Sequence, residues 1–180
     1  NHVQFTTDSF LALPRNALGK EYIVAGYKNV QSAMNLIGTQ FGVVACEADT
    51  LVTITPSVTT GSRAAGVAYT ITLQQGQAYQ LQNTNAVADL SGTIITATKP
   101  VAAFGGHSCA NVQSSTTFFC DTLLEQLLPV GLWGTEFATA PLATRSQYAV
   151  RVVAARDETH VQVNSVPPVT PSNVILNRGE

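Results

Sequence analysis

The pattern of apolar and polar positions along the chain is that of short strands separated by turns. Apolar residues occur in short runs, several of them alternating with polar residues, and Gly, Pro or polar clusters separate the runs. Short strands at this spacing are typical of a β-sandwich or barrel. We therefore predict an all-β fold of antiparallel β-sandwich modules. The expected strands are 22–25, 41–46, 50–55, 67–73, 78–82, 92–98 and 101–104.

One segment has helical spacing instead. Four leucines between 122 and 128 fall at positions that would share one helical face, Asp121 is placed to cap the start, and Pro129 would end the element. The sequence thus predicts at most one short helix, between Asp121 and Leu128.

The chain also contains an internal repeat. Residues 41–54 match residues 150–163 without a gap, 109 positions apart, and we call these segments the first copy and the second copy. Two flanking blocks match in the same order, 19–22 with 134–137 and 70–76 with 173–179. Three matched blocks in one order predict a tandem repeat.

The second copy indicates which face of each strand is buried. His160 and Gln162 alternate with Val161 and Val163, and the polar set should face water because strand side chains switch faces at every residue. By correspondence, we expect Val52 and Ile54 to face the core of the first copy, with Leu51 and Thr53 facing outward.

The repeat also predicts the domain organisation. Residues 1–128 should form a complete β-sandwich module, and residues 129–180 the first half of a second, homologous module. The second module lacks counterparts of the strands around Tyr79, Ile94 and Val101. We expect its open sheet edge to be completed by chain outside this sequence, or covered by a partner through self-association.

Composition narrows the class of protein. Hydrophobic residues make up 45% of the chain, but charged residues only 11%, against about 25% in an average soluble domain. The net charge of −2 and the lack of a basic run argue against nucleic-acid binding. No run approaches the roughly 20 apolar residues that span a bilayer, so no membrane insertion is expected. The composition favours a secreted or cell-surface protein, with this chain a piece of it.

The three cysteines fit that location. Cys109 and Cys120 flank a Ser/Thr-rich loop, and the spacing predicts a local disulfide between them, with Cys46 as a buried free thiol. Three reduced cysteines in a cytosolic protein are the alternative. Gly105-Gly106 should bend the chain into the disulfide loop.

Eight segments are specific when they are taken together: Gly19–Tyr22, Ala45–Pro56, Leu73–Leu81, Ala97–His107, Cys120–Asp121, Leu124–Leu127, Pro129–Val130 and Trp133–Gly134. Together they resemble the N-terminal domain of the IgGFc-binding protein family, large mucus-associated secreted proteins with relatives in other animals and in bacteria. The resemblance implies an extracellular β-rich domain, a paired Cys109–Cys120, and roles in surface adhesion or mucus structure. It implies no catalytic residue, and Fc binding, the namesake property, maps to no residue here.

Catalytic and metal chemistry find weak support in the sequence. His107, Cys109 and Asp121 could form a thiol nucleophile with its base, but only if Cys109 were reduced. The histidines are scattered, and the acidic turns at 47–49 and 156–158 are better explained as solvated hairpin turns than as calcium loops. We predict no enzyme activity, no metal and no cofactor.

Trp133 and Phe137, with His107, are the candidate binding or inter-module residues. Trp133 either stacks against a glycan or packs at the junction between modules. The leading hypothesis is a non-catalytic extracellular adhesion or structural module that binds other extracellular proteins or glycoproteins, mucus or immunoglobulin among them. The alternative is a glycan-binding, lectin-like β module.

Overall fold

The structure is a computed structural model that describes residues 2–3, 6–30, 38–112, 120–140, 143–144, 148–164 and 172–180. Within these residues every regular element is a strand except two 3-10 turns, η1 (Arg15–Ala17) and η2 (Val130–Leu132), so the all-β prediction is confirmed. The strands are β1 (His2–Val3), β2 (Thr6–Thr7), β3 (Gly19–Ile23), β4 (Thr39–Ala45), β5 (Thr50–Thr55), β6 (Tyr69–Leu73), β7 (Ala78–Asn83), β8 (Ile94–Ala110), β9 (Asp121–Gln126), β10 (Thr159–Val163) and β11 (Ser172–Leu176).

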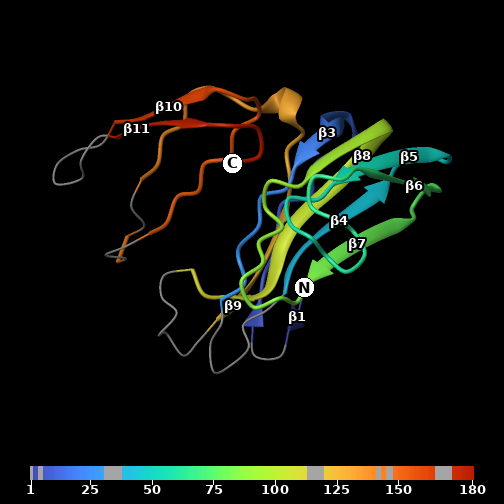
Figure 1. Cartoon of the computed structure of the whole chain (residues 1–180), viewed down its shortest axis with the longest axis horizontal. Coiled ribbons are helices and arrows are strands. Elements are labelled where there is room, and N and C mark those ends of the chain that lie inside the picture. Colours follow the sequence, from blue (N-terminus) through green and yellow to red (C-terminus); the bar gives the residue numbers. More distant parts are fainter. Residues whose placement is uncertain are drawn as a thin grey trace.

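The long strand β8 lies in the middle of the main sheet, and most other strands of the sheet pair with it (Figure 1). The first part of β8 pairs with β5 on one edge and β3 on the other, whereas its second part pairs with β4 and β9. All these pairings are antiparallel, and the main path of the sheet runs β6-β5-β8-β4-β7. The two end strands of that path meet through a hydrogen bond between the hydroxyls of Tyr69 and Tyr79, 2.9 Å apart, so the sheet is nearly barrel-like.

The two strands expected at 92–98 and 101–104 are therefore one strand, and Gly105-Gly106 does not bend it. Pro100 is tolerated because it lies where β8 changes partners: pairing with β5 ends at Ala97 and pairing with β4 begins at Val101. The two glycines are needed for close packing, because a Cβ at Gly105 would collide with the carbonyl oxygen of Ala25. The same atom at Gly106 would collide with the carbonyl oxygen of the neighbouring strand β9.

The short helix predicted between Asp121 and Leu128 is wrong, because residues 121–126 form strand β9. The disulfide holds the start of this segment beside the end of β8, and the backbone of the segment pairs with the edge of β8. Thr122, buried on β9, donates its hydroxyl to the carbonyl oxygen of Ser108 at 2.7 Å. Tertiary pairing thus overrides the helical spacing of the leucines, of which Leu127 enters the core and Leu128 stays exposed.

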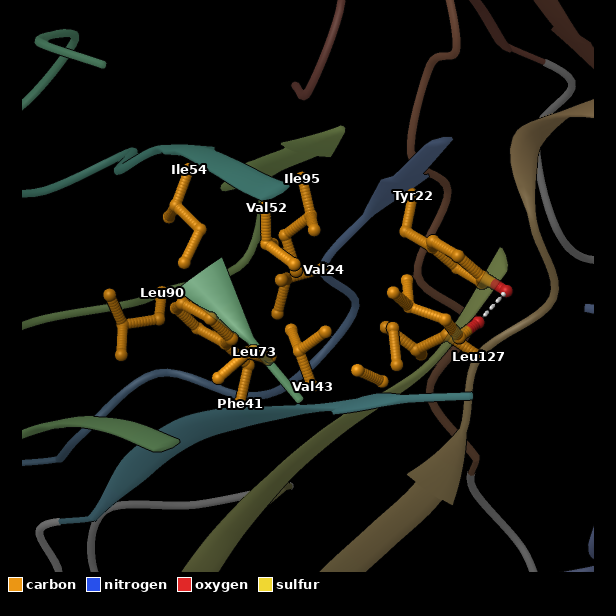
Figure 2. Close-up of a cluster of buried hydrophobic side chains, with 13 residues drawn as sticks. Tyr22, Val24, Phe41, Val43, Val52, Ile54, Leu73, Leu90, Ile95 and Leu127 are labelled. Carbon is orange, nitrogen blue, oxygen red and sulfur yellow. Dashed lines mark hydrogen bonds between the residues drawn. The ribbon is translucent and has the colours of Figure 1, made fainter. Parts of the chain in front are cut away.

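One core holds the main sheet together, and Figure 2 shows its side chains converging from strands far apart in sequence. Val52 and Ile54 are fully buried, while Leu51 is exposed and Thr53 half-buried, which confirms the faces predicted for the first copy. Tyr22 closes one end of the core, where its hydroxyl donates to the carbonyl oxygen of Val101 at 2.6 Å.

The C-terminal hairpin of β10 and β11 stands to one side of the main sheet (Figure 1). The turn before β10 reproduces the turn before β5. Asp49 and Glu158 both take a positive φ, 52° and 54°, and the hydroxyls of Thr50 and Thr159 each donate to the carbonyl oxygen three residues back, at 2.7 Å. The two copies therefore have the same local structure.

The backbone hydrogen bonds that join the residues after each hairpin to the alanine before its turn are also shared. The amide of Ala45 donates to the carbonyl oxygen of Gln77 at 3.1 Å and its carbonyl accepts from Gly76 at 2.9 Å. At the matching places, the amide of Ala154 donates to Glu180 and its carbonyl accepts from Gly179, both at 2.9 Å. The likeness thus extends beyond the turn to the residues that follow each second strand.

Candidate functional site

The disulfide between Cys109 and Cys120 is present, which confirms that prediction. It links the end of β8 to the start of β9, with the two Cα atoms 5.1 Å apart. Most of the loop that it closes, 113–119, lies outside the described residues. Cys46 is free as predicted but half-buried rather than buried, because it follows β4 into the polar turn before β5.

His107, one of the predicted binding residues, lies fully inside the module. Its Nδ1 accepts the amide of Cys109 at 3.0 Å, so its Nε2 carries the proton and donates to Oδ1 of Asn29 at 2.9 Å. Burial lowers the pKa of His107 to about 4, which keeps the ring neutral at physiological pH. His107 therefore stabilises the end of β8 as a hydrogen-bonding residue.

Asn29 connects this histidine to the rest of the buried polar network. Its Oδ1 also accepts the amides of Gly38 and Thr39, both at 2.8 Å, and its Nδ2 donates to the carbonyl oxygens of Asn83 and Asn85 at 2.9 and 2.6 Å. Every polar atom of the side chain is used, as buried amides require. The network therefore fixes the position of β7 relative to β8.

A surface hollow of about 450 Å³ lies at the far end of this network. Asn83 reaches from the network to the hollow, because its Nδ2 donates to Oγ1 of Thr60 at 2.8 Å and to the carbonyl oxygen of Thr59 at 3.0 Å. The tight turn from Thr60 to Arg63 forms one wall, with paired backbone hydrogen bonds of 2.9 and 3.0 Å. The other lining residues are Gly61, Ser62, Tyr79, Leu81, Gln82 and Thr84.

Arg63 and Tyr79 form the charged and aromatic part of the hollow, and Tyr69 contacts both of them. The guanidinium carbon of Arg63 lies 4.0 Å from the centre of the Tyr69 ring, a cation–π contact. Burial and the hydrogen bond to Tyr79 raise the pKa of Tyr69 above its ordinary value, so its hydroxyl stays protonated. The hollow thus presents a cation, an aromatic edge, amides and hydroxyls to a ligand.

Sequence reasoning missed this hollow. Tyr69 and Tyr79 lie on strands at opposite ends of the sheet path, and only the curling of the sheet brings them together. The run of Gly61, Ser62 and Arg63 in the β5–β6 loop was the available signal, because an arginine at a tight polar turn is well placed for binding.

The predicted residues Trp133 and Phe137 lie outside the main sheet. Trp133 follows η2, is half-buried, and donates its Nε1 hydrogen to the carbonyl oxygen of Leu128 at 3.0 Å. Phe137 is 80% exposed. His107 has no exposed area, so the three predicted residues do not share one surface, and a role for any of them in binding stays a prediction.

Exposed apolar side chains gather in the second copy and the residues around it. Of the fifteen exposed large apolar side chains in the described part of the chain, eight lie between 132 and 175. A second hollow of about 460 Å³ lies against the β10–β11 hairpin. Its lining residues are His160, Val161, Gln162, Asn173, Val174 and Ile175.

Two ion pairs link this region to residues of the N-terminal part of the chain. Arg151 contacts Asp89 at 2.5 Å and also donates to the carbonyl oxygen of Gly26 at 3.0 Å, and Arg178 contacts Glu21 at 2.6 Å. Burial alone would raise the pKa of Asp89, but hydrogen bonds from Arg151 and Ser91 hold it below its ordinary value. Partly exposed pairs of this kind contribute about 1 kcal/mol or less each.

Metal and membrane sites were also sought in the described residues. They contain no group of three or more His, Cys, Asp or Glu side chains that could hold a metal ion. None of their helices has the length and apolar character to cross a membrane.

These features define a disulfide-bonded, antiparallel β protein with two hollows on its surface. The chain belongs to the IgGFc-binding protein family, whose model matches residues 8–180 and confirms the resemblance carried by the sequence motifs. It is 39% identical over 163 residues to the human IgGFc-binding protein, an alignment that covers 88% of this chain and 3% of that protein. The chain therefore spans a small part of the relative it matches. No solved structure matches it.

Proposed function

We propose that the chain is a non-catalytic, protein-binding module of a larger extracellular protein with an adhesive or structural role. The observation that carries the proposal is the gathering of exposed apolar side chains between 132 and 175. Exposed apolar side chains that cluster in one part of a soluble protein mark interaction sites when they form a shared patch. The disulfide and the low content of charged residues support an oxidising, extracellular location.

The family supplies candidate partners. The human relative is named for binding the Fc region of immunoglobulin G. We extend to this chain the expectation that it binds an extracellular glycoprotein, with immunoglobulin Fc or a mucin as the partner.

The module organisation is part of the proposal. Residues 1–128 contain the core, the disulfide and the polar network, and act as one sandwich-type module. Residues 129–180 act as the first half of a second such module, and the shared turn and closure geometry of the two copies supports this assignment.

The proposal is tested by immobilising the chain and measuring binding of immunoglobulin Fc and of purified mucin. We expect saturable binding of at least one of them. Phe137→Ser and Ile175→Ser should weaken it about tenfold, because each removes exposed apolar contact area. Val87→Ser removes an equally exposed apolar side chain from the first module and should change nothing. Absence of binding to both proteins, or equal losses in all three variants, would contradict the proposal.

Glycan binding is a second candidate, and the hollow beside Arg63 and Tyr79 favours it. Its amides, hydroxyls and aromatic ring are groups that contact sugar hydroxyls and the apolar faces of sugar rings. A glycan array should then give binding that Arg63→Ala abolishes. Loss on Trp133→Ala instead would place the glycan on the surface predicted from sequence, and a blank array would reject the lectin hypothesis.

A further inference from the structure

We propose that the second copy is a strand-accepting site. Its ligand is an extended segment with a sequence pattern like that of β8, and this segment binds between residues 148–154 and β10. In the first module β8 lies between β4 and β5. The counterparts of β4 and β5 are residues 148–154 and β10, and the described chain places no strand between them. The inference deepens the proposed function, because it assigns a binding mode and a ligand class to the apolar region.

The first acceptor is the open edge of β10. Strand β5 pairs with β6 on one edge and with β8 on the other, whereas β10 pairs with β11 alone among the described residues. Ile54 is fully buried, but its counterpart Val163 is 39% exposed. An edge strand with unpaired backbone groups and an uncovered apolar face is a template for strand addition.

The second acceptor is the segment 148–154. Its counterpart β4 lies between β7 and β8, where Thr39, Phe41 and Val43 are 0, 1 and 0% exposed. The matching residues, Tyr148, Val150 and Val152, are 45, 56 and 46% exposed, and the segment is not a strand. A sequence with strand pattern therefore lies extended on the surface without the two neighbours that order it in the first module.

The first module specifies the register of the incoming strand. Val52 faces Ala97 and Ile54 faces Ile95, so Val161 and Val163 should face the equivalent residues of the ligand. Val43 faces Ala103, so Val152 should face a small residue further along the same ligand strand. The ligand is thus antiparallel to both acceptors, with apolar residues alternating in its first half and small residues in its second.

Two polar contacts add to this match. In the first module Lys99 donates to the carbonyl oxygen of Ala48 at 2.6 Å, and Oγ1 of Thr98 accepts the amide of Leu51 at 3.1 Å. The counterpart of Ala48 is Asp157, whose backbone carbonyl corresponds to the one that Lys99 contacts. Its Oδ1 accepts the amide of Arg178 at 3.0 Å, and its negative charge would favour a ligand lysine nearby. The occupant to which we commit is therefore a Thr-Lys-containing strand of a homologous module.

The probe for this site is a synthetic peptide with the sequence of residues 93–107 of this chain. Added to the intact chain, it should bind saturably by fluorescence anisotropy and slow amide exchange at 148–154 and 159–163 about tenfold or more, without changing exchange at 39–55. A peptide carrying Ile95→Lys should not bind, because it places a charge on the covered face. A peptide carrying Thr96→Lys, on the outward face, should bind normally.

Variants of the chain provide the reciprocal control. Val161→Lys should abolish peptide binding and Gln162→Lys should not, since the two side chains point to opposite faces of β10. Unchanged exchange at 39–55 shows that each variant is folded. The proposal is overturned if the peptide does not bind at millimolar concentration, or if it protects residues elsewhere. Equal losses in the two variants would overturn it as well.

The occupant and the proposed function can fail separately. If the free chain dimerises, Val161→Lys abolishes the dimer and the peptide of residues 93–107 does not compete with it, a second copy fills the site by other contacts. The commitment to a β8-like strand is then overturned. If the peptide binds but Fc and mucin do not, the accepting site stands and the proposed partners fall. If Fc or mucin binds equally well with the peptide in place, strand acceptance is not how the partner is bound.

Discussion

The β5–β6 hairpin and the β10–β11 hairpin are each preceded by the same turn, but they have different surroundings. Both turns place a positive φ at the acidic residue before the first strand and a threonine hydroxyl on the carbonyl three residues back. The apolar faces differ, because Val52 and Ile54 lie in a core while Val163 and Val174 are exposed. The comparison teaches that local sequence fixes the hydrogen bonding of a hairpin, and that neighbouring strands decide its burial.

The largest expected effect is a pH dependence of the free energy of unfolding of the main sheet, which contains His107 but not His160. His107 is neutral when folded with a pKa of about 4, against 6.5 when unfolded, so the unfolded state binds more protons between these values. The stabilisation is complete above pH 6.5 and is lost as the pH falls toward 4, at about 1.4 kcal/mol per pH unit. Urea unfolding across this window measures it.

The control for this prediction compares two histidines. His107→Gln should remove the slope, whereas His160→Gln, on the exposed face of β10, should leave it unchanged. A slope that persists in His107→Gln would assign the effect to other groups.

Removal of the disulfide should lower the stability of the main sheet, which contains β8 and β9, and should leave the β10–β11 hairpin unchanged. Cys109→Ser with Cys120→Ser should lower its free energy of unfolding by about 2–3 kcal/mol, because the unfolded loop is no longer constrained. Cys46→Ser, at the free thiol, serves as the control. Thermal unfolding measures the loss, and an equal effect of all the cysteine changes would contradict the prediction.

The pair Val43→Ala and Val152→Ala tests burial directly, because the same change is made at corresponding positions. Val43 is in the core, so we expect a loss of about 2 kcal/mol from the methyl groups and the cavity they leave. Val152 is exposed, so we expect less than about 0.5 kcal/mol. Chemical denaturation measures both, and similar losses would show that Val152 is buried in solution.

The smallest effect is expected from Arg151→Ala, which removes the ion pair with Asp89. Because both side chains are partly exposed, the first module should lose less than about 1 kcal/mol. Amide exchange at 148–154 should quicken a few-fold, since the segment loses its contacts with Asp89 and Gly26. Arg156→Ala, at the turn before β10, is the matched control and should leave exchange at 148–154 unchanged.

Alternation was enough to predict most strands and the faces of β5, because Val52 and Ile54 follow the period of a half-buried strand. It failed where long-range pairing decided the outcome. The leucines of 122–128 suit a helix, and only the edge of β8 makes 121–126 a strand. Pro100 looked like a break between strands, because the change of partners along β8 cannot be read from local sequence.

The candidate sites were predicted less well than the fold. The disulfide followed from spacing, whereas the binding roles expected for Trp133, Phe137 and His107 stay predictions. Asn29 carried no local signal, and the polar turn at Arg63 signalled only a possible binding position, because their partners His107 and Tyr69 reach them only through the folded sheet.

Amide hydrogen exchange on the free, intact chain tests the central claim most directly, since it compares the two copies in one molecule. The account predicts that residues 39–55 are strongly protected. Residues 148–163 should exchange about a hundredfold faster or more, because β10 pairs with β11 alone among the described residues and 148–154 is not a strand. Equal protection of the two segments in a monomer would show that both belong to one integrated fold, and would contradict the account.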